Sequence, residues 1–197
     1  MGKVIGIDSS EHMLNLARQG ASAANVEYRR MTVDQTDFAE NSFDGVVCTQ
    51  VLGYLADHPV EVIRKLLKVV KPTGRVFMAE TDWDSLAYSI ADKELQRKVT
   101  MAFTDHQGDG WVGRRLYSWC HEAGPREIEL HPYVIHNAEL SARRYGGPLS
   151  YVIRDFLLRT RKWPEAEVKR WLQQLNEAFD NKTYFFMLTR LVCVIRK

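Results

Sequence analysis

One acid that follows a short apolar segment is the first residue of the chain that points to chemistry. Residues 4–7 (Val-Ile-Gly-Ile) show no polar alternation, which is typical of a buried strand, and Asp8 comes directly after them. Ser9 and Ser10 follow and belong to the residue types that cap a helix. A strand that ends in an acid before a capped helix is typical of the second half of a nucleotide-binding βαβ unit, in which the acid accepts hydrogen bonds from ribose hydroxyls.

A second group of polar side chains follows the apolar segment 43–48. Gln50 lies two residues beyond this segment and Tyr54 lies four residues further on. In open α/β sheets, ligands bind beyond the carboxyl ends of the strands. We therefore expect Gln50 and Tyr54 to lie at a binding site.

The acids after the segment 75–80 and a later histidine are the candidates for proton transfer. Glu80, Asp82 and Asp84 could position a substrate hydroxyl or accept its proton, and histidine, the residue type of His106, titrates near neutral pH. Arg114 could hold a substrate carboxylate. For each of these residues the alternative is an ordinary solvated side chain. No spacing of histidines, cysteines and acids fits a metal site.

Strands and helices must alternate along the chain to bring these residues together. The alternation predicts a parallel sheet with right-handed crossovers, in which segment 43–48 is a central strand and the chain leaves the core after Glu80. Apolar spacing predicts strands over 4–7, 26–31, 43–48, 75–80, 127–135 and 184–195. It predicts helices over 11–20, 59–70, 93–106 and 112–122. Residues 141–180 are predicted to form a helical insertion that is broken at 146–148 and 163–164.

Composition narrows the class of protein. The 197 residues fit one domain, and the 45% hydrophobic and 26% charged content is that of an ordinary globular protein. A net charge of +2 without a long run of like charge gives no sign of nucleic-acid binding, and no apolar stretch reaches membrane-spanning length. Three widely separated cysteines, Cys48, Cys120 and Cys193, argue against a disulfide framework and fit a cytoplasmic protein.

The order of several motifs resembles one known family. Four stretches at normal spacing are similar to the class I S-adenosylmethionine-dependent methyltransferases, and three later stretches are similar to the small-molecule enzymes of the ubiquinone and menaquinone biosynthesis type. The first four are GKVIGIDSS (2–10), NSFDGVV (41–47), QVLGYL (50–55) and LLKVVKPTGRV (66–76); the later three are ETDWD (80–84), GWVGRRL (110–116) and YFFMLTRLVCV (184–194).

The resemblance implies a Rossmann-like α/β fold, S-adenosylmethionine as cofactor and a small molecule as methyl acceptor. It implies a single domain over residues 1–197, with a cofactor-binding part over 1–80 and a substrate part over 81–197 that contains the last two strands and a helical lid inserted before the final strand. Cofactor contacts are expected from Asp8, Ser9, Met13, Thr32, Val33 and Gln50, with Thr32 at the adenine position, and a substrate pocket from Tyr54, Trp83, Arg114 and Tyr145.

One part of the family pattern has no counterpart among the 197 residues. The family's first strand and its Gly-x-Gly-x-Gly loop, whose backbone N–H groups approach the methionine end of the cofactor, are absent, so we expect an N-terminally truncated sheet. In the family this strand lies between the strand that ends at Asp8 and the one that starts at Phe43. Three arrangements would relieve the gap: direct pairing of the two flanking strands, a homodimer that covers the edges, or an upstream segment of a longer protein.

Three functions remain open from the sequence. The first is a small-molecule methyltransferase with catalytic residues His106 and Asp82. The second is a catalytically inactive protein of this fold that binds a small molecule or a protein partner. The third, a dinucleotide oxidoreductase, is disfavoured because it needs the same glycine loop, and because stretches 41–44 and 71–76 favour the methyltransferase lineage.

Overall fold

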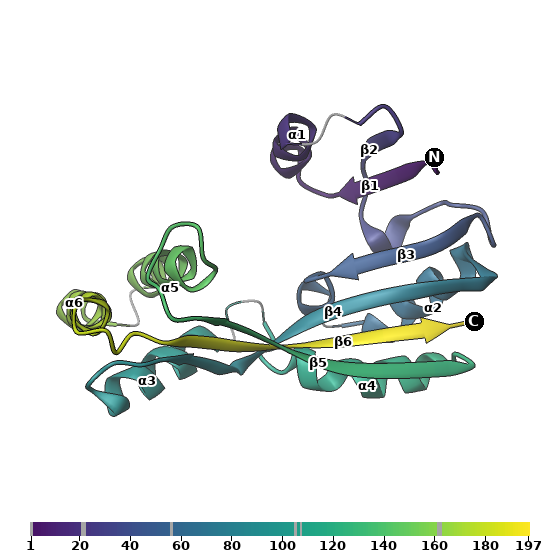
Figure 1. Ribbon diagram of the computed structural model, residues 1–197. Coiled ribbons are helices and arrows are strands. Elements are labelled where there is room, and N and C mark those ends of the chain that lie inside the picture. Colours follow the sequence, from purple (N-terminus) through teal and green to yellow (C-terminus); the bar gives the residue numbers. More distant parts are fainter. Residues whose placement is uncertain (1, 21–22, 56, 105, 107, 161–162) are drawn as a thin grey trace.

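The computed structural model describes residues 2–20, 23–55, 57–104, 106, 108–160 and 163–197. Strands and helices alternate along the chain (Figure 1). The strands are β1 (Val4–Asp8), β2 (Val26–Arg30), β3 (Phe43–Thr49), β4 (Val70–Tyr88), β5 (Glu127–Asn137) and β6 (Phe186–Arg196). The helices are α1 (Glu11–Gly20), α2 (Pro59–Val69), α3 (Lys93–Thr104), α4 (Val112–Ala123), α5 (Gly146–Thr160) and α6 (Glu165–Asp180), with short 3₁₀ helices η1 (Val33–Gln35) and η2 (Leu52–Tyr54).

The described strands form two separate sheets. One holds β1 and β2 in parallel, and the other has the order β3-β4-β6-β5, in which β3 and β4 are parallel and β6 is antiparallel to both β4 and β5. The direct pairing of the strands that end at Asp8 and begin at Phe43, one of the three arrangements considered above, is therefore wrong. β3 pairs with β4 alone and is an edge strand in its sheet, so the expectation of a central strand over 43–48 is also wrong.

β4 is the longest strand, with 19 residues, and it runs well past the predicted end at Glu80. Its second half pairs with β6 up to Tyr88 opposite Phe186, with an irregularity between Asp82 and Ala87. Trp83, Leu86 and Tyr88 in this half are buried. The prediction that the chain leaves the core after Glu80 is wrong because a second core lies along this half of the strand.

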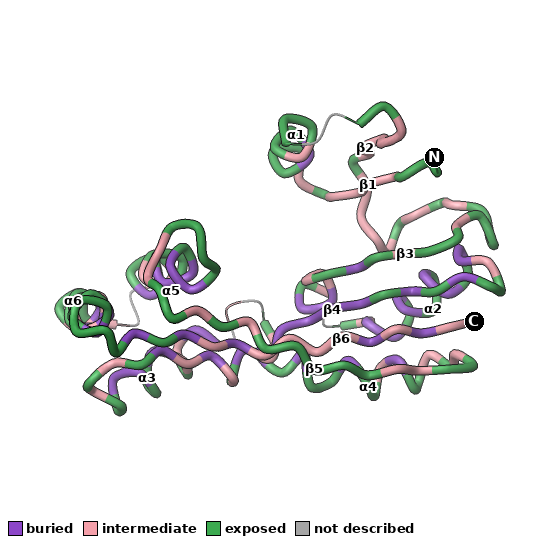
Figure 2. Tube along the Cα trace, viewed as in Figure 1, coloured by how far each residue is buried: buried purple, intermediate pink, exposed green. Residues whose placement is uncertain are grey.

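Two apolar cores stabilise the four-stranded sheet. The first lies between the sheet and helices α2 and α4, and it contains Ile63, Leu66, Met78, Leu116 and Ile195 among other residues. The second lies where β4 and β6 meet helices α3, α5 and α6. Figure 2 shows that the buried positions gather along the sheet and on the helix faces turned toward it.

The N-terminal unit, β1 with α1 and β2, has almost no core of its own. Among its described residues only Leu14 is buried, with 2% of its surface exposed, whereas Val4 and Met13 are 52% and 51% exposed. Figure 1 shows this unit beyond β3, at the margin of the molecule. Its strands therefore pair with each other without the buried apolar face that stabilises the other sheet.

The helical insertion before the last strand is confirmed. α5 and α6 lie between β5 and β6 in the chain and pack on each other and on α3. The predicted break at 146–148 is wrong, because Gly146, Gly147 and Pro148 form the first turn of α5. A proline is tolerated there because the first N–H groups of a helix have no intrahelical partner. The predicted helix over 93–106 ends at Thr104, and residue 105 lies outside the described residues.

Candidate functional site

The carboxyl end of β1 places Asp8 where the sequence predicts a ribose ligand. Asp8 Oδ1 accepts a hydrogen bond of 2.7 Å from the backbone N–H of Ser10, and the Asp8 carbonyl accepts one of 3.1 Å from Met31. Ser9 contributes its carbonyl oxygen to Arg30 Nε at 3.1 Å. The Ser10 hydroxyl caps α1 weakly through the Met13 N–H at 3.4 Å. These hydrogen bonds connect the turn after β1 to α1 and β2.

Thr32 and Val33 follow the neighbouring strand β2. The Thr32 hydroxyl oxygen is buried and makes no hydrogen bond within the described residues. Val33 begins η1 and packs against the core under α2, and the Asp34 carbonyl next to it accepts a hydrogen bond from Lys65 Nζ on α2. Because β1 and β2 are parallel and adjacent, their carboxyl ends lie side by side, with Asp8 opposite Arg30 in the register. The structure therefore brings Asp8, Ser9, Met13, Thr32 and Val33 together in one region.

The turn after β3 places Gln50 in a different setting. Its φ of 56° is left-handed, and its backbone N–H and Nε2 both donate to the Ala79 carbonyl, at 2.9 and 3.2 Å. Its Oε1 accepts a 2.8 Å hydrogen bond from the Thr81 hydroxyl. The Gln50 side chain is thus hydrogen-bonded to β4 and anchors the turn after β3 to that strand.

Glu80, on β4 beside this turn, is 1% exposed. One carboxylate oxygen accepts hydrogen bonds from the N–H groups of Val51 and Leu52, both at 2.9 Å. Burial raises the pKa of Glu80 from 4.5 to about 7, while the two backbone hydrogen bonds and nearby Arg190 act in the opposite direction. The turn that leads to Tyr54 is therefore stabilised by a buried acid that titrates near neutral pH.

Asp82 and Arg114 form an ion pair. Arg114 Nη2 donates to both Asp82 carboxylate oxygens, at 2.6 and 2.7 Å, and Nη1 lies 3.6 Å from Asp84. Gly113, just before Arg114, makes this approach possible, because a Cβ there would lie 2.5 Å from the Asp82 backbone nitrogen. The pairing neutralises both side chains, so each is already bound to the other rather than to a substrate in this state.

His106 and Trp83 lie in an aromatic cluster at the end of α3. The His106 ring stacks on Phe103 with centroids 3.9 Å apart, and it meets the Trp83 ring edge-on at 4.5 Å. Its Nδ1 lies 2.8 Å from the Phe103 carbonyl oxygen, so Nδ1 donates its hydrogen there. The structure thus places His106 against the buried rings of Phe103 and Trp83.

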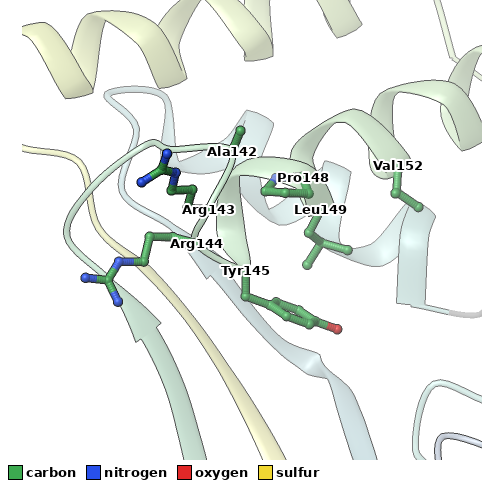
Figure 3. Close-up of a pocket in the computed structure, with 7 residues that line it drawn as sticks. All are labelled: Ala142, Arg143, Arg144, Tyr145, Pro148, Leu149 and Val152. Carbon is green, nitrogen blue, oxygen red and sulfur yellow. The ribbon is translucent and has the colours of Figure 1, made fainter. Parts of the chain in front are cut away.

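Tyr145 comes directly before α5 and its ring contacts β6. Its ring is covered by the Arg190 guanidinium at 5.8 Å, and Arg190 stands opposite Thr81 across β4 and β6. The ring also lines an open pocket of about 420 Å³ beside α5, where Figure 3 shows the Arg143 and Arg144 side chains pointing away from it. Thr81 and Arg190 thus connect Tyr145 with Gln50, whereas Asp82 is bound to Arg114 of α4.

Sequence reasoning missed the structural part that Glu80, Thr81 and Arg190 play. Glu80 and Thr81 directly follow an apolar run in the sequence, which is the one available signal that they are buried. Their hydrogen-bond partners in the turn after β3 are 28 to 31 residues away in the sequence. A local sequence pattern therefore could not predict these contacts.

The described part of the chain contains neither a membrane-spanning helix nor a cluster of metal-binding side chains. None of the helices within the described ranges is long and apolar enough to cross a membrane. No group of three or more histidines, cysteines or acids within the same ranges is placed to hold a metal ion.

Comparison with known sequences identifies a family and several relatives. Residues 1–78 match the family model described as "Methyltransferase domain". The chain is 34% identical over 125 residues, 62% of its length, to an uncharacterized 37.1 kDa protein in transposon TN4556 of Streptomyces fradiae, and 37% identical over 91 residues, 45% of its length, to a ubiquinone biosynthesis O-methyltransferase of Pseudomonas aeruginosa. The aligned parts span 36% and 39% of these two relatives.

Comparison with solved structures supports the fold. A putative methyltransferase from Bacillus halodurans has a TM-score of 0.59 at 19% identity, with 99% of this chain and 83% of that chain covered. A phosphoethanolamine N-methyltransferase from Haemonchus contortus, solved with S-adenosylhomocysteine, has a TM-score of 0.55 at 16% identity, with 99% and 44% covered. At such identities the likeness shows the fold alone. Together with the family match over residues 1–78, it confirms the resemblance to the class I S-adenosylmethionine-dependent methyltransferases.

Proposed function

We propose that this chain binds S-adenosylmethionine at the carboxyl ends of β1 and β2 and belongs to a methyltransferase that acts on a small molecule. One observation carries the proposal: the buried, unpaired hydroxyl of Thr32 lies beside a strand that ends in Asp8. A buried polar atom without a partner costs about 1–3 kcal/mol, and a bound group with a hydrogen-bonding edge would remove that cost. The named methyltransferase relatives support the same cofactor.

The residues of this chain fit part of the cofactor. The Asp8 carboxylate suits the two ribose hydroxyls and the Thr32 hydroxyl suits a polar edge of adenine. The Gly-x-Gly-x-Gly loop expected at the methionine end has no counterpart in the 197 residues. We therefore expect weak binding, with a dissociation constant no tighter than roughly 100 μM, or about −5.5 kcal/mol.

In this proposal, catalysis consists mainly of alignment. The cofactor supplies a methyl group that is already activated as part of a sulfonium ion. The protein has to hold the acceptor atom in line and exclude water. His106 and Asp82 are the candidate bases, and Asp82 would first have to leave Arg114. Tyr54 and Tyr145, which are both exposed, would contact the acceptor, whereas the predicted pocket residue Trp83 is buried in the second core.

A second candidate is a protein of the same fold that binds a ligand without catalysis. The observation that favours it is the state of the N-terminal unit, in which Leu14 alone among the described residues is buried. A cofactor site on such a weakly packed unit would hold its ligand too loosely for efficient alignment. Methyl transfer from radiolabelled S-adenosylmethionine to a panel of small phenols and carboxylic acids separates the two candidates.

Calorimetric titration with S-adenosylmethionine and S-adenosylhomocysteine tests the binding proposal directly. We expect Asp8→Ala to abolish the heat of binding and Thr32→Val to weaken binding several-fold. Asp155→Ala, on the exposed side of α5, is the matched control because it also removes one carboxylate. Equal binding by wild type and Asp8→Ala would place the ligand elsewhere, and submicromolar binding by wild type would contradict the expected weakness.

We also propose that a second copy of the chain covers the open sheet edges in the cytoplasm. β1 and β3 each pair on one side only within the described residues, and an unpaired edge is a ready template for another chain. The three free, buried cysteines fit a reducing compartment. Light scattering over a range of concentrations tests the assembly; a monomer mass at every concentration would contradict it.

A further inference from the structure

The turn between β3 and η2 is held in an unfavourable backbone conformation by contacts from β4. Gln50 has a φ of 56°, which for a residue with a side chain costs roughly 1–2 kcal/mol. Its backbone and its amide are both tied to β4, through the Ala79 carbonyl and the Thr81 hydroxyl. Because residue 50 is not a glycine, the hydrogen bonds to β4 must hold its backbone in this conformation.

The buried carboxylate of Glu80 on β4 also stabilises this turn. It accepts the N–H groups of Val51 and Leu52, and Leu52 is itself fully buried in the core under α2. Burying a carboxylate costs several kcal/mol, and an apolar pair at such a position is often more stable. Strain and a buried acid therefore meet at the carboxyl end of a parallel strand, where open α/β sheets bind their ligands.

We propose that Glu80 is a positioning residue for ligand binding, which together with Thr81 holds the turn Gln50–Leu52 in the shape that the bound cofactor requires. This inference rests on the proposed binding of S-adenosylmethionine. Glu80 does not contact the ligand, because it is buried and its Oε1 already accepts two backbone N–H groups. The turn it fixes leads on to Tyr54, which is exposed to solvent.

The charged and titratable neighbours of Glu80 come from three elements. Cys48 faces it from β3 and Arg190 from β6, and both interact with it electrostatically. Asp82, two residues along β4, is paired with Arg114 of α4. Because the Asp82–Arg114 pair is internally neutral, Glu80 is the acid in this group whose titration changes the charge near neutral pH.

Substitution at Glu80, with S-adenosylhomocysteine as the probe, tests the inference in the full chain. Glu80→Gln keeps an oxygen that can accept both N–H groups, so we expect its affinity at pH 6 to stay within about threefold of wild type. Glu80→Ala leaves both donors buried and unpaired, and we expect a loss of about tenfold or more in affinity.

A pH profile distinguishes positioning from simple stabilisation. An ionised carboxylate accepts stronger hydrogen bonds than a neutral one, so wild-type affinity should increase between pH 6 and pH 8, whereas that of Glu80→Gln should stay flat. Leu175→Ala is the control, because Leu175 lies on α6 in the other core. It should lower the overall stability but leave the affinity for S-adenosylhomocysteine and its pH dependence unchanged.

Each outcome decides the inference. Wild type that binds no S-adenosylhomocysteine at 1 mM, about ten times the tightest expected dissociation constant, overturns the proposed function and this inference together. Wild type that binds, with Glu80→Ala within twofold of it, overturns this inference alone. If Glu80→Ala does not fold, Thr81→Val decides instead, because it removes the hydrogen bond to Gln50 Oε1; unchanged affinity in that variant overturns the inference.

Discussion

The N-terminal unit and the four-stranded sheet have similar strand and helix sequences, but they differ in how many apolar side chains they bury. β1 and β2 pair in register over five residues each and carry α1, yet the described part of this unit buries Leu14 alone. β4 and β6 are covered by two clusters of buried residues. Secondary structure forms in both regions, but only the second has the buried apolar surface that stabilises a fold.

The largest expected effect comes from the core of the sheet region. Trp171→Ala should lower the free energy of unfolding by about 3–5 kcal/mol, because it empties a fully buried position and leaves Gln96 Oε1 without its 3.0 Å donor. Urea denaturation followed by circular dichroism measures it. Leu16→Ala, on the exposed side of α1, is the comparison in the N-terminal unit and should change the global transition by less than about 0.5 kcal/mol.

The pH dependence of stability should reflect Glu80. Its pKa is about 7 in the folded chain against 4.5 as the reference value, so the folded state binds the proton more tightly. Its contribution is present below pH 4.5 and is lost as the pH rises through 7, by about 3 kcal/mol in total. Subtracting the stability curve of Glu80→Gln from that of wild type isolates this change; a flat difference between pH 4.5 and 8 would contradict it.

A smaller and local effect is expected at Leu14. Leu14→Ala should destabilise α1 and its contact with β1 and β2 by about 2 kcal/mol, while the global transition of the sheet region stays nearly unchanged. Amide hydrogen exchange resolves the two regions, with faster exchange in residues 4–20 alone. Equal acceleration in β4 would show that the two regions unfold as one unit.

The smallest effect is expected at Val47, which is 74% exposed on edge strand β3. Val47→Thr keeps the β-branched shape and should change the stability of a monomer by less than about 0.5 kcal/mol. If a second copy covers this edge, the same substitution should instead raise the dissociation constant of the dimer. Analytical ultracentrifugation of the two proteins measures both quantities.

Sequence patterns predicted most elements because these depend on near neighbours. The apolar run 4–7, the helical spacing of Ile63, Leu66 and Leu67, and the alternation over 127–135 each correspond to a described strand or helix. Errors arose where pairing decided the outcome, as for β3, which is as apolar as a central strand but lies at an edge.

The candidate site shows the same division. Asp8 was evident because an acid directly after an apolar strand is a local pattern. The Asp82–Arg114 ion pair joins residues 32 positions apart, and the hydrogen bonds from Val51 and Leu52 to Glu80 span 29 and 28 positions. Such contacts have no local pattern from which to infer them.

By itself, the sequence determined the order of strands and helices, the lineage of the fold and the acid at the end of β1, because hydrogen bonding and side-chain alternation within a segment depend on residues close in the chain. Only the tertiary structure decided that Glu80 is buried with a raised pKa, that Asp82 is bound to Arg114, and that β1 and β3 lie in different sheets. The physical reason is that burial and electrostatic environment are set by segments that are distant in the sequence and meet only when the chain has folded.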